Sequence, residues 1–495
     1  METWAADVAE THAGVVFFAG DRAYKLKKPV DLGFLDFSTR ERRERACHRE
    51  VELNRRFAPD VYLGVADVVM PPGTPCDHLV VMRRMPAERR LSDLVRAHAP
   101  VDDALRAIAR LLARVHAASP RSAEISAPGT RDALRERWIA SFDQVRPFHG
   151  RAIDASDAGE VERLTLRFLE SREPLFTARI HEGRIVDGHG DLMADDIFCL
   201  DDGPRVLDCL DFDDRLRRLD GLDDAAFLAM DLERLDSPHL AEHFVSWYAE
   251  YADDPAPPSL RHHYVAYRAF VRAKVACLRW GQGDTHAAGD AGRYTGIALR
   301  HLYAGSVGLI LVGGLPGTGK TALSEALGDR LGYTVLGSDR IRKELAELSP
   351  DTPAPAPYGT GIYNAFWTRR TYTELLTRAA RLLSYGESVI VDASWTSARH
   401  RADAARTAEQ AHADLISLRC DTPLAGERLH TRPRGASDAD PTIAAQMAQS
   451  ADPWPEAITI DTSGPIDDSA ERALRVIRPH GPDHAWQRRP RMAPD

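Results

Sequence analysis

A glycine-rich stretch in the second half of the chain carries the residue types that bind phosphate. Gly314 is followed after four residues by Gly319, Lys320 and Thr321. Glycines let the backbone turn back on itself, so that successive N–H groups converge on one phosphate oxygen, while Lys320 would reach the β- and γ-phosphates and Thr321 would hold Mg²⁺. The stretch therefore predicts a site for a nucleoside triphosphate, taken as ATP, together with Mg²⁺. The binding residues are expected to be Gly314, Leu315, Pro316, Gly317, Thr318, Gly319, Lys320, Thr321 and Ala322.

The elements on either side fit this interpretation. Residues 307–312 form a short run of branched apolar residues, which is typical of a strand buried on both faces. After the glycines, apolar residues recur at helical spacing until Gly332, which has the position of a helix C-cap. The order strand, glycine loop, helix is the one that such a phosphate site requires.

Asp339 and Arg342 follow the phosphate loop and are the next residues whose types could take part in a reaction. Residues 334–336 read as a strand, and Ser338 is expected to cap the next helix. In a parallel sheet this places Asp339 at the carboxyl end of the strand next to the phosphate loop. There Asp339 could take the proton of an acceptor hydroxyl as catalytic base, and Arg342 could hold an anionic group. The alternative is that Asp339 only stabilises the start of its helix.

Further along the chain, one acid and several arginines are also candidate residues of the phosphate-binding site. Residues 388–391 read as a buried strand that ends on Asp392, which could hold Mg²⁺, contact the acceptor or cap the next helix. Arginines at 428, 432 and 434 stand at the start of an expected lid. Arg432 and Arg434 are predicted to neutralise charge on the transferred phosphoryl group, although arginines also occur on ordinary helix surfaces.

The pattern of these elements resembles the small P-loop kinases, among them the zeta-toxin-like and polynucleotide-kinase-like groups. The resemblance covers residues 305–478 and implies an α/β P-loop NTPase fold with a parallel sheet. It also implies ATP-dependent phosphoryl transfer.

The first half contains its own set of carboxylates. Asp191 lies in the sequence His189-Gly-Asp191, and a hairpin of residues 197–200 and 205–210 follows it, with Asp208 on the second strand. A phosphotransferase needs one carboxylate for the acceptor hydroxyl and others to hold Mg²⁺. Near the N-terminus, a hairpin within residues 12–30 places Lys25 and Lys27 on one face, which alone would suggest only a solvated edge.

This half resembles the aminoglycoside and choline phosphotransferases, whose kinase loop has the form H-G-D, and that resemblance implies an α+β protein-kinase-like fold. It implies that Asp191 is the catalytic base and that Asp196 and Asp208 are metal ligands. Lys25 or Lys27 would be the lysine that contacts ATP, with Glu50 as its ion-pair partner in a helix over residues 40–57. Asp196 stands where the family has Asn, Met193 where it commonly has His, and no G-x-G-x-x-G loop precedes Lys25, so that any phosphate cover would come from residues 12–14.

Composition narrows the possible partners. The formal charge of −10 argues against broad nucleic-acid binding, and no apolar run reaches about 18 residues, so no membrane span is expected. Six scattered cysteines without a C-x-x-C pair favour reduced thiols in the cytoplasm, and the histidines at 262, 263 and 286 show no metal-ligand spacing and are expected at the surface.

Taken together, the chain resembles bacterial fusions of an aminoglycoside-phosphotransferase-like domain with a P-loop kinase. We expect the first domain at residues 1–304, the second at 305–478 and a disordered tail at 479–495. The predicted function is ATP- and Mg²⁺-dependent transfer of phosphate to the hydroxyl of a small molecule. Two alternatives remain: the first half regulates the second as a weakly active module, or it phosphorylates aminoglycoside-type antibiotics.

Overall fold

The chain divides into two compact units. The computed structural model describes residues 7–10, 13–31, 33, 35–70, 73–349, 352, 357, 359–431 and 440–478. One unit comprises residues 1–162, 176–256 and 261–301, and the other comprises residues 163–175, 257–260 and 302–495. The domain limits at residues 304 and 478 stay a prediction, and the tail at 479–495 lies outside the described residues. None of the described helices is both long enough and apolar enough to cross a membrane.

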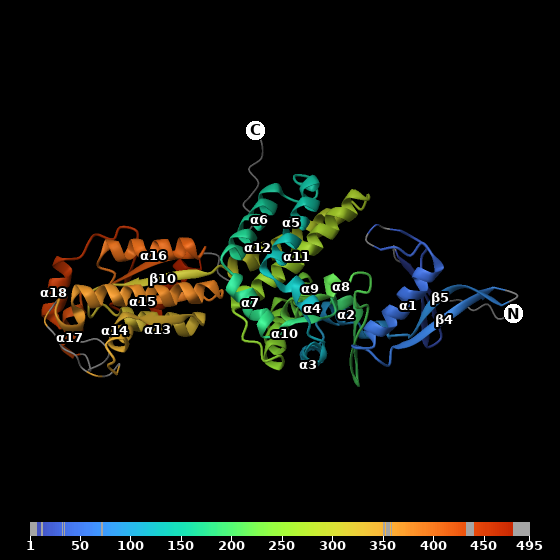
Figure 1. The fold of residues 1–495 in the computed structure, drawn as a ribbon, viewed down its shortest axis with the longest axis horizontal. Coiled ribbons are helices and arrows are strands. Elements are labelled where there is room, and N and C mark those ends of the chain that lie inside the picture. The colour runs from blue at the N-terminus through green and yellow to red at the C-terminus, as the bar shows by residue number, and fades with distance from the viewer. Residues whose placement is uncertain are drawn as a thin grey trace. The chain divides into compact units, whose positions relative to one another are not determined.

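The first unit begins with an antiparallel sheet of five strands in the order β1-β2-β3-β5-β4. Helix α1 (Arg40–Asn54) packs against β4 and β5 (Figure 1). The predicted hairpin is confirmed as β2 and β3. The strands are β1 (Asp7–Glu10), β2 (Gly14–Ala19), β3 (Arg22–Lys27), β4 (Tyr62–Met70) and β5 (Thr74–Arg83).

The sequence of α1 explains why it buries a carboxylate. Thr39 caps the helix by accepting a hydrogen bond from the backbone N–H of Arg42 at 3.3 Å. Cys47 and Val51, four residues apart, pack with strand residues in a hydrophobic cluster. Glu50 lies beside them and is 1% exposed, so the helix carries its carboxylate to the sheet.

The remainder of the first unit is mostly helical, with two small antiparallel sheets, β6–β9 and β7–β8. The sequence pattern predicted no element between residues 119 and 185, where α4 to α7 lie. Helices that begin before residue 301 are α2 (Leu91–Arg96), α3 (Asp102–Ala118), α4 (Ala123–Ser126), α5 (Arg131–Val145), α6 (Ala155–Glu170), α7 (Glu173–His181), α8 (Asp214–Arg217), α9 (Gly221–Arg234), α10 (Pro238–Tyr251), α11 (Pro258–Gly281) and α12 (Ala287–Ala304). The small strands are β6 (Ile185–Asp187), β7 (Ile197–Leu200), β8 (Gly203–Val206) and β9 (Arg218–Asp220).

One expected element is shorter than predicted. Strand β8 ends at Val206, because the register of the β7–β8 hairpin runs only from Ile197–Val206 to Leu200–Gly203. Asp208 therefore lies beyond the strand, in a left-handed conformation with φ 61°. Its predicted place on the second strand was wrong.

The second unit contains a parallel sheet of five strands in the order β11-β12-β10-β13-β14. The phosphate loop follows β10, so β12 and not β11 is its neighbour on one side. The expectation that Asp339 follows the adjacent strand was therefore wrong, although both strands end at the same edge. The strands are β10 (Gly308–Gly313), β11 (Thr334–Gly337), β12 (Val389–Asp392), β13 (Asp414–Asp421) and β14 (Ile458–Asp461).

Helices cover both faces of this sheet. A hydrophobic core joins α13 and α19 to one face, through residues such as Leu323, Ile310 and Ala470. Helix α15 contacts β10, β11 and β12, and α16 contacts β13 and α15. The helices are α13 (Lys320–Leu331), α14 (Ser338–Leu345), α15 (Ala365–Ser384), α16 (Ala398–Gln410), α17 (Ala425–Thr431), α18 (Pro441–Gln449) and α19 (Ile466–Ile477). Gly337, not Ser338, is the N-cap of α14, whereas Gly332 ends α13 with φ 68° as predicted.

Candidate functional site

The glycine loop between β10 and α13 requires its glycines. Gly314, Gly317 and Gly319 have φ values of 144°, 85° and 83°, which side chains rarely allow. A Cβ atom on Gly314 would lie 2.5 Å from Oγ1 of Thr318 and 2.8 Å from the backbone oxygen of Cys420. The loop delivers the chain into α13, whose N-terminus has no side-chain cap. Its first N–H groups can therefore serve an anion.

Asp392 stands beside the end of this loop. The hydroxyl of Thr321 donates to Oδ2 of Asp392 at 2.7 Å, and among the described residues no partner reaches the buried Oδ1. Burial raises the pKa of Asp392, while the positive charge of Lys320 acts against that rise. A hydroxyl and a carboxylate at this position fit Mg²⁺, which commonly uses one or two carboxylates plus phosphate oxygens. In the described part of the chain, no group of three or more His, Cys, Asp or Glu residues is arranged to hold a metal by itself.

Asp339 and Arg342 lie in α14, at the edge of the sheet where the phosphate loop also begins. Arg342 is 6% exposed, and its Nη1 donates to the backbone oxygen of Ile362 at 3.0 Å and to the hydroxyl of Thr368 at 3.3 Å. Its guanidinium also lies 5.0 Å from the ring centre of Tyr363. The Nε atom is buried and has no partner among the residues that the structure describes. The roles of both residues stay predictions.

An arginine of the expected lid contacts the loop through an intermediate residue. Arg428 donates to the backbone oxygen of Thr462 at 2.7 Å, and the hydroxyl of Thr462 donates to the backbone oxygen of Thr318 at 2.7 Å. Arg432 and Arg434 lie outside the described residues. Of the three arginines, Arg428 is thus the one that the structure locates beside the phosphate loop.

In the first unit, two lysines share one carboxylate. Lys25 and Lys27 of β3 donate to the two oxygens of Glu50, at 2.9 and 2.7 Å. The predicted ion pair with Glu50 is confirmed, and it involves both candidate lysines because alternate residues of a strand face the same way. Burial alone would raise the pKa of Glu50, but the two ammonium groups hold it at about 2.

Each lysine also pairs with a second acid. Lys25 donates to Asp208 at 2.7 Å, and Lys27 donates to Asp211 at 2.8 Å. Asp208 is 55% exposed and Asp211 only 16% exposed. Sequence reasoning missed Asp211, although the pair Asp211-Phe212 matches the D-F of the kinase metal motif and could have indicated it.

The charge of Asp208 also acts on Asp191 and Asp196. Burial raises the pKa of Asp191, and Asp208 adds to that rise while Arg272 opposes it. Burial, then Asp208 and Asp191, raise the pKa of Asp196 well above its usual range. Asp196 ends the short 3₁₀ turn η4 (Ala194–Asp196) that leads into β7. The negative charges of Asp191, Asp196 and Asp208 thus influence one another, but these three described residues are not arranged as a group that could hold a metal by itself.

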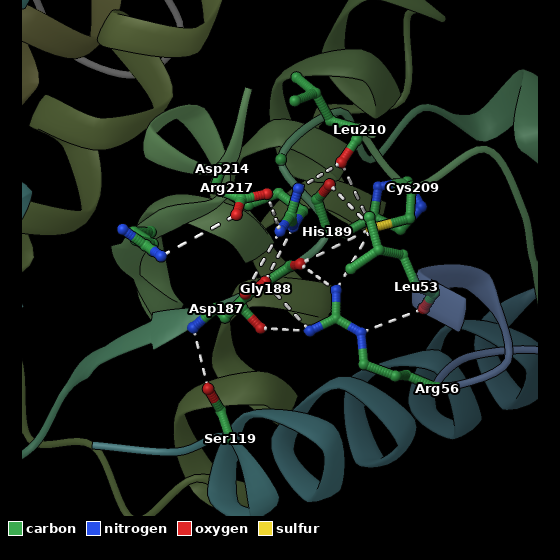
Figure 2. A network of polar contacts seen from close by, with 12 residues as sticks. Leu53, Arg56, Ser119, Asp187, Gly188, His189, Cys209, Leu210, Asp214 and Arg217 are labelled. Atoms are coloured by element: carbon green, nitrogen blue, oxygen red, sulfur yellow. Dashed lines mark hydrogen bonds and ion pairs between the residues drawn. The ribbon is translucent and has the colours of Figure 1, made fainter. Parts of the chain in front are cut away.

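Two arginines, the buried Arg217 and the partly exposed Arg56, hold the loop that leads to Asp191 (Figure 2). Arg56, just beyond α1, donates to the backbone oxygens of Asp187 and Gly188, each at 2.9 Å. Arg217 donates to the side chain of Asp187 at 2.8 Å and to the backbone oxygen of Leu210 at 2.8 Å. Arg217 thus ties the loop that begins at Asp187 to the segment that contains Leu210, and Arg56 ties the same loop to the end of α1. No spacing in the sequence signals these arginine–backbone contacts.

A second anchor lies beneath the same loop. Asp224 of α9 accepts from the backbone N–H groups of His189 and Gly190, at 2.7 and 2.8 Å, and from Nε2 of His116 at 3.0 Å. A Cβ atom on Gly188 would lie 2.5 Å from Oδ2 of Asp224, so glycine is required there. The Nε2 of His189 lies 3.0 Å from the backbone oxygen of Leu207, which leaves Nδ1 to accept from the N–H of Asp191 at 3.4 Å. These contacts fix the backbone on which Asp191 stands.

Family models match both halves of the chain. Residues 20–263 match the phosphotransferase enzyme family, and residues 309–453 match an AAA domain. The fold and the two sites therefore define a protein built from a kinase-like domain of the phosphotransferase family and a P-loop kinase domain.

Two relatives are similar to this chain over nearly its whole length. An uncharacterized protein of Mycobacterium tuberculosis is 44% identical over 474 residues, which cover 95% of each chain. A protein of Mycobacterium bovis shows the same identity and coverage. The chain belongs to the same family as these proteins.

Solved structures match portions of this chain at low sequence identity. A choline/ethanolamine kinase family protein from Mesorhizobium loti covers 61% of this chain and 93% of its own, with 14% identity and a TM-score of 0.38. A putative kinase from Chloroflexus aurantiacus covers 34% of this chain and 98% of its own, with 20% identity and a TM-score of 0.29.

Proposed function

We propose that this protein is an ATP- and Mg²⁺-dependent phosphotransferase whose main active site is the phosphate loop of the second unit. The observation that supports this most is the hydroxyl of Thr321 at 2.7 Å from Asp392, whose second oxygen is buried and unpaired in the described structure. Thr321 and Asp392 would hold Mg²⁺, which supplies charge neutralisation at the phosphates. Residues 314–322 would bind the triphosphate, with Lys320 at its β- and γ-phosphates.

The acceptor is a small molecule with a hydroxyl group. Asp339 would take the proton of that hydroxyl as base, because it stands at the sheet edge where the loop begins. Arg342 would hold the acceptor, and Arg432 and Arg434, together with Arg428, would stabilise charge on the transferred group. The six cysteines are all free, which favours a reducing compartment, and we place the protein in the cytoplasm.

The first unit would form a second kinase site. Asp191 would be its base, Asp196 with Asp208 or Asp211 would hold Mg²⁺, and Lys25 or Lys27 would contact ATP. One observation favours the alternative of a regulatory or weakly active module: the lysines and two of the acids already neutralise one another. ATP and Mg²⁺ would have to replace those ion pairs.

Two single substitutions in the full chain test this assignment. Lys320→Ala should abolish ATP turnover if the second unit is the main site, and Asp191→Ala should leave most of it. Binding of a non-hydrolysable ATP analogue to each variant shows whether the first unit still takes nucleotide. Unchanged turnover in Lys320→Ala would overturn the main proposal, and phosphorylation of an aminoglycoside that depends on Asp191 would assign the first unit to antibiotic modification.

A further inference from the structure

The chain makes a strained turn over residues 393–395, directly after Asp392. Trp395 has a φ of 52°, which lies in the left-handed region that a bulky side chain rarely adopts. Its side chain is fully buried. Such a backbone conformation costs free energy and persists only where the surrounding contacts hold it, and residues of this kind cluster at functional sites. The contacts of the turn therefore show which part of the molecule depends on it.

The turn contacts the beginning of the phosphate loop. The backbone N–H of Gly314 donates to the backbone oxygen of Ser394 at 3.3 Å. A Cβ atom on Gly313 would lie 3.2 Å from Cδ1 of Trp395, so the indole ring packs against the residue that precedes the loop. Because the turn follows Asp392 directly, it joins the carboxylate of Asp392 to the loop through a few backbone bonds.

Tyr372 of α15 holds this turn through its hydroxyl. The hydroxyl accepts from the backbone N–H of Trp395 at 3.2 Å and lies 3.2 Å from the hydroxyl of Ser394. A phenol has one O–H to donate and lone pairs to accept, so both contacts can form at once. Burial raises the pKa of Tyr372, so its hydroxyl keeps the proton at neutral pH. Loss of that hydroxyl would take away the partner of a buried N–H group.

The ring of Tyr372 is itself fixed by two other rings. His400 stacks on it with centres 3.9 Å apart and an angle of 15° between the planes. Trp395 meets it edge to face, with centres 5.2 Å apart and an angle of 74°. A ring packed in this way keeps its hydroxyl in one place. A site for Mg²⁺ needs supporting residues that are locked like this, because the ion demands a nearly ideal octahedral arrangement of its ligands.

We propose that Tyr372 is a positioning residue of the phosphate-loop site. Its hydroxyl holds the turn after Asp392, so that the carboxylate keeps the orientation in which it accepts from Thr321 and can hold Mg²⁺. The same hydroxyl keeps Ser394 in the place where its backbone oxygen fixes the N–H of Gly314. Tyr372 acts through these groups and does not touch the nucleotide. This role rests on the proposed function of the phosphate loop.

Binding of a fluorescent, non-hydrolysable ATP analogue to the full chain tests this role without any turnover. The affinity is measured with saturating Mg²⁺ and again with EDTA, and the binding that remains in Lys320→Ala is subtracted, because it belongs to the first unit. The ratio of the two affinities reports how well the site holds Mg²⁺. In Tyr372→Phe we expect this ratio to fall about 10-fold, since loss of an outer partner of a metal site commonly weakens metal binding by such a factor. The affinity with EDTA should change much less, because the glycine loop and Lys320 remain.

Tyr385→Phe is the matched control, because Tyr385 lies at the other end of α15 and is 37% exposed. It should keep the full Mg²⁺ ratio. Ser394→Ala is a second variant, which removes only the half-buried hydroxyl that meets Tyr372. Its ratio should fall by a smaller factor, about 3-fold, because the N–H of Trp395 keeps its partner. Thermal unfolding of the second unit checks that each variant is folded.

The outcomes separate the role of Tyr372 from the proposed function. A Mg²⁺ ratio in Tyr372→Phe that matches the unsubstituted protein, or an equal fall of both affinities, would overturn the positioning role and leave the proposed function in place. If Tyr372→Phe fails to fold, an unchanged ratio in Ser394→Ala overturns the role in the same way. Absence of Lys320-dependent binding in the unsubstituted protein would instead overturn the proposed function, and the role of Tyr372 with it.

Discussion

The two candidate sites differ in how their charged groups are satisfied. In the second unit, one oxygen of the buried Asp392 has no partner among the described residues. In the first unit, Lys25 and Lys27 neutralise Glu50, Asp208 and Asp211. One site has a carboxylate oxygen that is unpaired in the described structure and can take a cation as it stands, whereas the other must break ion pairs before it can bind Mg²⁺ and ATP. Although both sites contain lysines and aspartates, we therefore expect nucleotide binding to cost more free energy in the first unit than in the second.

The largest expected effect is a loss of stability on substitution of Lys27, the more buried of the two lysines. Lys27 is 4% exposed and pairs with Glu50 and Asp211, and loss of one partner of a buried ion pair costs about 3–5 kcal/mol. Lys27→Met should therefore destabilise the first unit by about that amount. Lys25→Met should cost less, because Lys25 and Asp208 are 22% and 55% exposed. Urea unfolding of the first unit measures both variants, and equal losses would show that burial does not distinguish the two lysines.

The next effect would test the open carboxylate of the second unit. Asp392→Asn should lower Mg²⁺-dependent ATP turnover about 100-fold, measured in an Asp191→Ala background so that the first unit is silent. Asp403→Asn is the matched control, because Asp403 lies in α16 of the same unit and pairs with Arg406 at the surface. A turnover in Asp392→Asn within a factor of two of the control would contradict the role of Asp392.

Acid should reveal the ion pairs of the first unit. The pKa of Glu50 is about 2 in the folded protein, against a usual value of 4.5. Because the folded pKa is lowered, the stabilisation is present above pH 4.5 and is lost as the pH falls from about 4.5 towards 2. Unfolding by urea between pH 6 and pH 3 measures this slope. Glu50→Gln should flatten it, and an unchanged slope in that variant would show that other groups cause the acid sensitivity.

The smallest effect is expected at Asp196. Its pKa is raised, whereas that of Glu50 is lowered, so its substitution should stabilise the folded state. Burial and two neighbouring carboxylates raise the pKa of Asp196 well above its usual range, so the charged form destabilises the folded state at neutral pH. Asp196→Asn should raise the stability of the first unit by about 1 kcal/mol at pH 7 without Mg²⁺. Thermal unfolding measures this, with the exposed Asp202→Asn as the control. A destabilised Asp196→Asn would show that Asp196 already has a compensating partner.

Sequence reasoning succeeded where the site is local. The strand, the glycine loop, α13 and its glycine C-cap are contiguous, so short-range patterns predicted all four. It failed where distant segments decide the result. His263 was expected at the surface but is 2% exposed, and its Nε2 accepts from Trp138, a residue 125 positions away in the chain (263 − 138).

The sequence by itself determined that Lys25 and Lys27 lie on one face of β3, because the alternation of side chains along a strand is a local pattern, while their place beside the acids was implied only by the resemblance of the H-G-D loop. Only the tertiary structure decided which groups meet. Strand β8 ends before Asp208, and that end allows Lys25 to pair with Asp208 and Lys27 with Asp211. In the second unit, the insertion of β12 between β10 and β11 brought Asp392 to Thr321. Strand ends and strand order depend on hydrogen bonds between segments far apart in the chain, which no local pattern specifies.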